Sequence, residues 1–379
     1  MRVLHFTASK VWRGHEQMII DIYESFRDNG FVEDQIIVCK SDSEIYKVAT
    51  GKNLQVQVFD FKSEYNLKAA RKFKEIVTEY GADIIKIHNS KAHTISVLSS
   101  VFFGLNVPMV LSRTLIKNIG TNFFRKYKYN YKGIKKIICI SEPVADILKS
   151  SIKNHDKMIV IGSVVDTESF IHNKKNGFLH REFNIPLEYK IIGNVSAFSK
   201  VKDHYTWVNT VEELFKRGVK AKYILIGEGS LELEIKNYVK SKRLENEVIF
   251  AGFRSDVQKC IPEFDLFLFT SKSEATGGVI LESYACKVPV VAARAGGIPT
   301  VLIDNETGLL AEVGDFMDFA DKTELLINDK LLQDKFVKKG YEFLMTTSTR
   351  LIIGKKIVNI LNEVVSTNLI NKKNIKYDL

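Results

Sequence analysis

Short apolar runs alternate with amphipathic stretches along the chain. In the first half the runs fall at residues 2–7, 35–39, 54–59, 83–87, 108–112, 136–140 and 158–161. Between most of them apolar positions recur with helical spacing, for example over 64–80 and 91–103. Continuous apolar runs separated by amphipathic helices are typical of buried parallel strands with helical crossovers. The pattern therefore predicts an α/β domain with a parallel sheet.

A second series follows a break in this pattern. Residues 171–188 are polar, contain Gly177 and Pro186, and lose the periodicity, which is typical of a linker. Further strands are then predicted at 190–196, 222–227, 247–251, 265–270 and 288–293. The length of 379 residues suits two domains, each with its own core. The ranges predicted are a first domain at 1–170, a linker at 171–188, a second domain at 189–347, a helix at 348–370 and a frayed tail at 371–379.

One loop of the second series carries most of the chemical information. The strand predicted at 265–270 is followed by a polar loop with Glu274, by Gly277 and Gly278, and by a helix that carries Glu282. Open α/β sheets bind ligands at the carboxyl ends of their strands, where this loop lies. Glycines at a helix start leave backbone N–H groups and the positive end of the helix dipole open to a phosphate. The two glutamates would flank that phosphate and accept hydrogen bonds from hydroxyl groups.

This arrangement, with seven residues between the two glutamates, resembles the retaining glycosyltransferases of the GT-B fold, family 4 type, or group 1 glycosyl transferases. The resemblance covers residues 1–365 and is strong in the second half. It implies two Rossmann-like domains facing a central cleft, with a C-terminal helix crossing back to the first domain. The other segments that carry it are RGHE (13–16), a degraded first glycine loop, VIGSVVDTESF (160–170), LIGEGSLELEI (225–235), VIFAGF (248–253) and AGGIPTVLIDNETGLL (295–310), which resembles the second glycine loop and its following strand.

The resemblance also implies which residues bind the donor, a nucleotide-diphosphate sugar. Glu282 corresponds to the residue that binds the ribose hydroxyls, and Glu274 to the catalytic residue that orients the sugar. Lys202 matches a catalytic lysine on the diphosphate, whereas Ala197 replaces the usual arginine; Lys200 is a candidate for the missing charge. No Asp-x-Asp or His/Asp cluster lies nearby, so neither a metal nor another cofactor is expected. The other donor-binding residues expected are Ser196, Gly227, Phe253, Gly277, Gly278, Val279, Gly296 and Gly297.

The first domain is expected to bind the acceptor. Gly14 keeps one position of the family's first glycine loop, and Glu16 is expected to cap the helix that begins there. In IHNSKAH, His88 and His93 are predicted to lie in a loop after the fourth strand, His88 in a catalytic role and His93 against the acceptor. A packed or solvated histidine is the alternative for His88. Arg113, at the end of the next strand, would bind an anionic acceptor or the donor phosphate.

Composition favours a cytoplasmic protein. The four cysteines are scattered in apolar contexts, without the spacing of a metal site or a disulfide framework. The N-terminal run, MRVLHFT, is too short for a signal peptide and is predicted to be a core strand. No stretch approaches the ~20 apolar residues that a membrane span needs. We therefore expect a cytoplasmic chain, peripheral on the inner face of the plasma membrane.

The net charge of +10 is concentrated in one region. Residues 113–157 hold eleven Lys or Arg against three Asp or Glu, and within them residues 121–136 interleave aromatic and basic side chains. Such a helix is typical of an anionic membrane surface, with a solvated surface helix as an equal alternative. Nucleic acid is the rival ligand of a basic aromatic patch, but no nucleic-acid-binding motif accompanies it, so no nucleic-acid partner is expected.

Together these features predict a retaining glycosyltransferase that moves a sugar from a UDP-sugar to a cell-surface polysaccharide or lipid-linked glycan. A GT-B nucleotide-sugar epimerase would share the fold but should show clearer acid and base carboxylates in the first domain. An inactive nucleotide-sugar-binding module stays open because of Ala197 and because Arg13 stands where the family has a glycine. A nicotinamide dehydrogenase would need GxGxxG after the first strand, which residues 8–16 lack.

Overall fold

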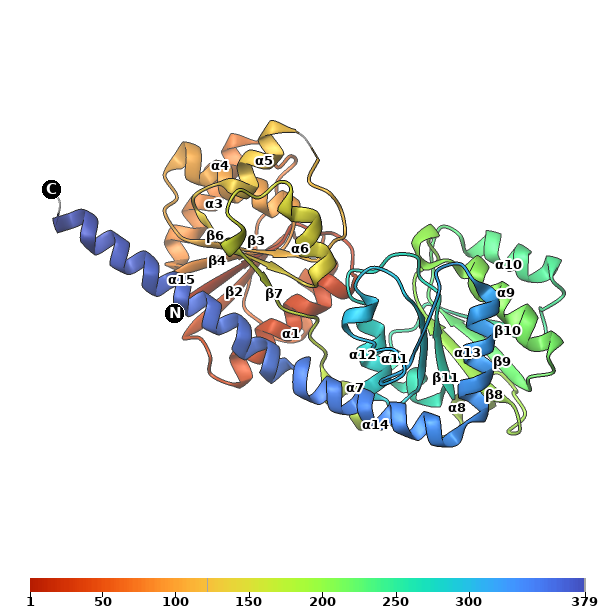
Figure 1. Cartoon of the computed structure of the whole chain (residues 1–379). Helices are drawn as coiled ribbons and strands as arrows, with labels where there is room; N and C mark the ends of the chain where they lie inside the picture. Colours follow the sequence, from red (N-terminus) through yellow and green to blue (C-terminus); the bar gives the residue numbers. More distant parts are fainter. Residues whose placement is uncertain (121, 378–379) are drawn as a thin grey trace. The chain divides into compact units, whose positions relative to one another are not determined.

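The computed structural model describes residues 1–120 and 122–377 and divides into two compact units. The first unit combines Met1–Val164 with Arg350–Leu379, and the second is Val165–Thr349. Each unit is a parallel sheet flanked by helices (Figure 1). The predicted α/β class with two Rossmann-like domains is therefore confirmed.

The sheet of the first unit has seven parallel strands in the order β3-β2-β1-β4-β5-β6-β7. The order reverses between β1 and β4, which creates the switch point where doubly wound sheets bind ligands. The strands are β1 (Arg2–Phe6), β2 (Asp34–Cys39), β3 (Val56–Val58), β4 (Ile84–Ile87), β5 (Met109–Arg113), β6 (Ile134–Cys139) and β7 (Met158–Val160).

Helices pack on both faces of this sheet because neighbouring strand residues point to opposite sides. Phe6 stacks on Phe73 of α3, whereas Val3 joins a core with Phe26 of α1 and Leu361 of α15. The helices of the first unit are α1 (Gly14–Asp28), α2 (Glu44–Gly51), α3 (Leu67–Tyr80), α4 (Ser90–Phe103), α5 (Phe123–Asn130), α6 (Glu142–Lys149) and α15 (Arg350–Tyr377).

The last helix, α15, is held against α1 by both ionic and close backbone contacts. Arg350 Nη2 donates to Asp21 Oδ1 at 2.8 Å and to Glu24 Oε2 at 2.6 Å. Gly354 fits against Ser25, since a Cβ at this glycine would lie 2.0 Å from the serine Oγ. The return of the C-terminal helix to the first domain, as the resemblance implied, is therefore present.

The sheet of the second unit repeats the same topology with six parallel strands, in the order β10-β9-β8-β11-β12-β13. Its switch point lies between β8 and β11, so the loops after these two strands lie side by side. The strands are β8 (Lys190–Val195), β9 (Ala221–Ile226), β10 (Val248–Gly252), β11 (Leu266–Phe269), β12 (Val290–Ala293) and β13 (Leu309–Ala311).

One continuous apolar core fills the second unit, with Trp207, Tyr223 and Phe267 fully buried within it. Its helices are α7 (Thr167–Ile171), α8 (Phe178–Glu182), α9 (His204–Lys216), α10 (Glu232–Ser241), α11 (Val257–Cys260), α12 (Gly278–Ala285), α13 (Phe316–Asn328) and α14 (Lys330–Thr347). Short 3₁₀ turns at Lys200–Lys202 and Ile298–Thr300 follow β8 and β12.

Two predicted boundaries are wrong. The range 171–188, predicted to be a linker, lies inside the second unit and contains α8. Within this range the backbone N–H of Gly177 donates to both oxygens of the buried Glu263 carboxylate, at 2.9 and 3.1 Å. The C-terminal helix continues past 370 to Tyr377, because no glycine or proline after Gly354 interrupts it. Of the predicted tail, residues 378 and 379 lie outside the described residues.

Candidate functional site

Two of the predicted donor residues meet in the second unit, although 72 positions separate them in the chain. Lys202, in the turn after β8, lies 2.5 Å from Glu274 Oε1 in the loop after β11. Ser271 Oγ donates to the same carboxylate oxygen at 2.8 Å. Both charged side chains are partly accessible, with exposed fractions of 24% and 16%. A ligand can therefore reach the pair.

The two glycine loops are joined to Glu274 through the backbone. Gly297 N–H donates to the Glu274 carbonyl oxygen at 2.7 Å. Gly277 precedes α12 with φ of +79°, a left-handed conformation that leaves the first N–H groups of the helix unblocked. Gly296 also has a positive φ, +52°, and is exposed. The loops after β11 and β12 thus form one connected backbone surface around Glu274.

The remaining donor residues of this loop lie in the first turns of α12. Gly278 and Val279 are half-buried at the helix start, and Glu282 is half-buried one turn later. The helix is short, from Gly278 to Ala285, and its other face packs into the core through Ile280 and Leu281. This packing orients the N-terminus of α12 toward the same end of the sheet as Glu274.

A second close approach of backbone lies beside β8. Gly227, after β9, has φ of +139°, and a Cβ there would lie 2.2 Å from the carbonyl oxygen of Ser196. Ser196 Oγ donates to Asn194 Oδ1 at 2.6 Å, while Gly227 N–H donates to the Gly252 carbonyl at 2.8 Å. Phe253, which follows, is 66% exposed. These predicted donor residues therefore line the neighbouring loops of β8, β9 and β10.

Asp203 and His204 were not predicted, yet both are buried directly after the lysine turn. Asp203 adopts a left-handed φ of +50°, is 3% exposed and forms an ion pair with Lys272 at 2.9 Å. Burial, and next the charge of Lys202, lower the pKa of His204 to about 4. The only sequence signal was their position between a strand and a helix. Lys200 and Ala197 are both exposed in this segment.

In the first unit, His88 is a buried residue. It is 3% exposed, and its Nε2 lies 3.2 Å from His5 Nδ1 on β1. Burial, followed by the charge of Lys86, holds the pKa of His88 well below its ordinary value. His88 therefore has the surroundings of a packed histidine, the alternative given above. Any catalytic role would have to use its neutral imidazole.

The loop position predicted for His93 is wrong. His93 lies in the first turn of α4, has no exposed surface, and packs edge-on against Tyr129 with ring centroids 4.9 Å apart. Its Nε2 lies 3.0 Å from the Lys128 carbonyl oxygen. The helix begins at Ser90 because Asn89 caps it, accepting from Ala92 N–H at 3.0 Å. His93 is therefore packed inside the unit, while its Nδ1 has no hydrogen-bond partner among the described residues, and its contact with an acceptor stays a prediction.

Several polar atoms near the carboxyl end of the first sheet are buried without a hydrogen-bond partner within the described residues. They are His15 Nε2 and Glu16 Oε2 at the start of α1, Arg113 Nε at the end of β5, and Ser141 Oγ after β6. Burial raises the pKa of Glu16. Arg113 also donates to Tyr129 OH at 3.3 Å. Gly14 is exposed at the first turn of α1. Unpartnered buried polar groups are uncommon, and a polar ligand is one of the things that satisfies them.

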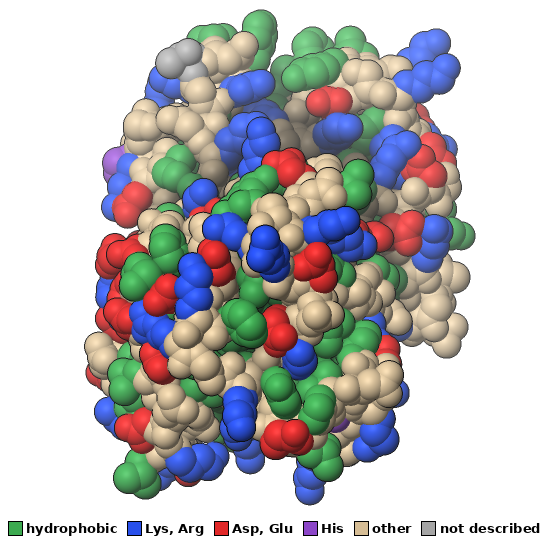
Figure 2. All heavy atoms as spheres, turned by 90° about the vertical axis from the view of Figure 1, so that its right-hand side faces the viewer, with side chains coloured by type: hydrophobic (Ala, Val, Ile, Leu, Met, Phe, Trp, Pro, Cys, Tyr) green, Lys and Arg blue, Asp and Glu red, His purple; other side chains and the backbone are tan. Residues whose placement is uncertain are grey.

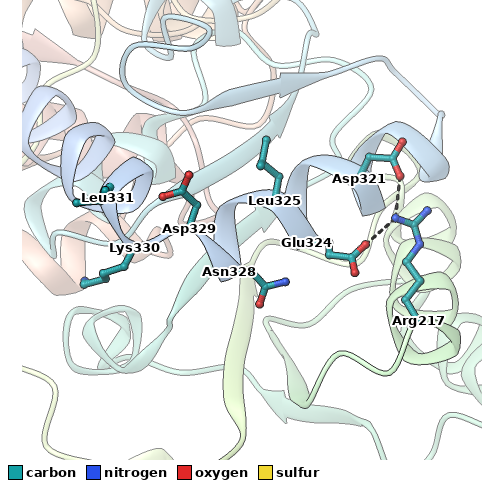
Figure 3. Close-up of a pocket in the computed structure, with 8 residues that line it drawn as sticks. All are labelled: Arg217, Asp321, Glu324, Leu325, Asn328, Asp329, Lys330 and Leu331. Carbon is teal, nitrogen blue, oxygen red and sulfur yellow. Dashed lines mark hydrogen bonds and ion pairs between the residues drawn. The ribbon is translucent and has the colours of Figure 1, made fainter.

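A surface pocket lies away from these loops. It has a volume of about 730 Å³ and is lined by α13, the start of α14 and Arg217, the residue after α9 (Figure 3). Arg217 points to α13, where Nη1 lies 2.7 Å from Asp321 and 2.9 Å from Glu324. Two carboxylates thus surround the one guanidinium, so Arg217 is already paired and is not free to bind a phosphate.

Two family models match the sequence and together span most of it. The model for glycosyl transferases group 1 matches residues 175–343, and the glycosyltransferase family 4 model matches residues 12–169. The chain is a glycosyltransferase whose second unit matches the group 1 model. The first match contains the Glu274 and glycine loops, and the second contains the first sheet.

Two named relatives of this glycosyltransferase match most of its length. It is 27% identical over 293 residues to N-acetyl-alpha-D-glucosaminyl L-malate synthase of Bacillus anthracis, covering 76% of each chain. It is 24% identical over 364 residues to the O-antigen biosynthesis glycosyltransferase WclY of Escherichia coli, covering 89% of this chain and 94% of that protein.

Solved structures confirm the predicted GT-B fold. A glycosyltransferase from Rickettsia africae superposes with a TM-score of 0.85 at 20% identity, covering 96% of this chain and 98% of that one. Anabaena HepE in complex with UDP and glucose superposes with a TM-score of 0.83, also at 20% identity, covering 96% of this chain and 100% of that one.

Within the described ranges of this glycosyltransferase, no helix combines the length and apolar character needed to cross a membrane. The same residues contain no group of three or more His, Cys, Asp or Glu placed to hold a metal ion.

Proposed function

We propose that this glycosyltransferase transfers a sugar from a UDP-sugar to a hydroxyl group of a cell-surface polysaccharide or lipid-linked glycan, with retention of anomeric configuration. The observation that supports this proposal most strongly is the Lys202–Glu274 pair, 2.5 Å apart, beside the glycine loops at the β8/β11 switch point. The UDP and glucose named with HepE support the choice of donor. The O-antigen function named for WclY supports the acceptor class.

Donor binding would transfer the ion pair of Lys202 from Glu274 to the diphosphate. The diphosphate needs positive charge and aimed N–H groups as negative charge develops on it, and Lys202 with the first N–H groups of α12 can supply both. In the present state Glu274 accepts from Lys202 and Ser271. A diphosphate taking over Lys202 would leave the Glu274 carboxylate to orient the sugar. Glu282 is assigned to the ribose hydroxyls, and exposed Lys200 is assigned to the charge missing at Ala197.

Retention requires the acceptor oxygen to attack the face from which the diphosphate departs. In the proposed step the bond from the anomeric carbon to the phosphate oxygen breaks and the bond to the acceptor oxygen forms on the same side. The acceptor proton passes to the departing phosphate oxygen. Glu274 would stabilise positive charge on the sugar ring without becoming covalently attached. Lys202 and helix N–H groups would take the place of a metal ion, so the reaction is proposed to be metal-independent.

The first unit is proposed to bind the acceptor. Its unpartnered buried polar atoms on His15, Glu16, Arg113 and Ser141 provide donors and acceptors suited to the hydroxyl groups of a glycan. Arg113 adds positive charge for an acceptor that carries phosphate. His88 is proposed to position the acceptor hydroxyl through its neutral imidazole.

The test separates the roles of the two glutamates. Glu282→Ala should weaken binding of UDP by roughly 1–3 kcal/mol, because a charge-assisted hydrogen bond to the ribose is lost. Glu274→Ala should leave UDP binding unchanged and abolish transfer. Calorimetry with UDP, and with GDP as the matched control nucleotide, measures both. Equal losses of affinity in the two variants would refute the assignment, and NMR of the anomeric proton in the product tests retention.

An inactive nucleotide-sugar-binding module is the second candidate, favoured by Ala197 in place of arginine. This candidate predicts UDP-sugar binding with neither transfer nor slow hydrolysis of the donor. Ala197→Arg should then raise affinity for UDP without creating turnover, whereas in an active enzyme hydrolysis of the donor is measurable in the unaltered chain.

A further inference from the structure

Helix α5 of the first unit has one side attached to the unit and one side exposed. On the attached side Tyr129 is 5% exposed and packs against His93. Lys128 Nζ donates to Ser90 O at 3.0 Å, to Ser90 Oγ at 2.9 Å and to Thr94 Oγ1 at 3.0 Å. Lys128 therefore holds α5 against α4, and its ammonium group is not available to an external ligand.

The opposite side of α5 presents adjacent aromatic rings to solvent. Phe123 and Phe124 are each 75% exposed, with ring centroids 5.8 Å apart, and Tyr127 is 46% exposed. Leu115 in the preceding loop is 58% exposed. Single exposed apolar residues are ordinary, but a contiguous group rimmed by charged residues marks a binding surface. The rim is basic, since Arg125, Lys126 and Lys132 are all exposed. These six residues, Phe123, Phe124, Arg125, Lys126, Tyr127 and Lys132, are called the α5 face below. Thr121, within the stretch predicted to contact membrane, lies outside the described residues.

Charge is divided unequally between the two units. The second unit carries 24 Lys or Arg and 27 Asp or Glu, whereas the first carries 31 and 18. The face drawn in Figure 2 shows acidic and basic side chains next to one another. The excess positive charge of the chain thus belongs entirely to the unit that carries the α5 face. A negatively charged partner would be attracted to that unit.

We propose that the α5 face docks on the surface of an anionic lipid bilayer. Phe123, Phe124 and Tyr127 would insert at the headgroup level while Arg125, Lys126 and Lys132 contact anionic headgroups. A bilayer fits better than nucleic acid because three rings are exposed together on a short helix, where they can insert among headgroups, and no nucleic-acid-binding motif accompanies them. This inference does not rest on the donor chemistry proposed above, and it makes a lipid-linked or membrane-associated acceptor accessible to the first unit.

The experiment is sedimentation of the full chain with vesicles of phosphatidylcholine alone or with 30% phosphatidylglycerol. The bound fraction should rise with the anionic lipid and fall with added salt, because the attraction is screened over ~8 Å at physiological ionic strength. The triple variant Arg125→Gln, Lys126→Gln, Lys132→Gln should reduce partitioning about a hundredfold, since each cation contributes ~1 kcal/mol near such a surface. Phe123→Ser with Phe124→Ser should reduce binding at high salt as well, because insertion of rings is not screened.

The matched control is Lys240→Gln, Lys338→Gln, Lys339→Gln, which removes the same charge from exposed positions of the second unit and should sediment like the parent. Thermal unfolding shows that each variant is folded, and calorimetry with UDP tests the proposed function independently. Three outcomes would overturn the proposal. They are no binding of the parent to anionic vesicles, equal sedimentation of the α5 variant and the parent, and tighter binding to single-stranded nucleic acid than to vesicles.

Discussion

Lys86 is a basic side chain buried inside the first unit, and replacing it with an apolar residue should stabilise that unit. It lies on β4 beside His5 of β1, is 1% exposed, and donates to Ser112 Oγ at 2.6 Å. Burial lowers the pKa of Lys86 from 10.5 to about 7. Each pH unit of that lowering corresponds to ~1.4 kcal/mol, so keeping the charged lysine buried costs roughly 5 kcal/mol at most. Lys86→Met keeps the length of the side chain and removes the charge.

The pH dependence identifies the cause. The pKa of Lys86 is lower in the folded chain than in the unfolded one, so between pH 7 and 10.5 the unfolded chain binds more protons. The free energy of unfolding of the parent should therefore rise with pH across that window, and below it the full cost remains. Lys86→Met should be more stable than the parent at pH 6.5, and its advantage should shrink steadily toward pH 10.

Urea unfolding, followed through a single tryptophan, can report the stability of the first unit alone. The chain has two tryptophans, Trp12 in the first unit and Trp207 in the second. Trp207→Phe leaves Trp12 as the reporter and removes a buried indole N–H that has no partner in the described residues. Lys72→Met, at an exposed position of α3, is the matched control and should show no comparable pH effect. A difference between Lys86→Met and the parent that is constant with pH, or a less stable variant at pH 6.5, would refute the reasoning.

Two other expected outcomes concern the donor loops. Gly227→Ala should lower the melting temperature and the UDP affinity more than Gly252→Ala. A Cβ at Gly227 would lie 2.2 Å from the Ser196 carbonyl oxygen, whereas no heavy atom lies within 4 Å of a Cβ at Gly252. Both glycines have positive φ, so equal effects would show that backbone strain alone matters. Transfer activity should persist in excess chelator, since Lys202 and backbone N–H groups are proposed to hold the diphosphate, and loss of activity restored by magnesium or manganese would contradict this.

The sequence by itself was sufficient for the alternation of strands and helices and for the position of the Glu274 loop. These features depend on local patterns: an apolar run long enough for a strand, a glycine pair before a helix, and polar residues between them. The strand β13 was the exception, because the apolar pattern did not single out Leu309–Ala311 and only the resemblance implied a strand there. The range 171–188 was misread for a related reason. Its polar surface hides a few apolar side chains, such as Leu179, that reach the core of the second unit.

Tertiary structure decided which partner each polar side chain has. The 2.5 Å approach of Lys202 to Glu274 depends on β8 and β11 being neighbours in the sheet, which no local pattern encodes. The inward direction of Lys128 likewise depends on α5 packing against α4, and it separates this lysine from Arg125 and Lys126 in the same helix. A sequence shows which residues can carry charge or bury surface. Distances between elements far apart in the chain arise only when the sheets assemble and burial selects the partners.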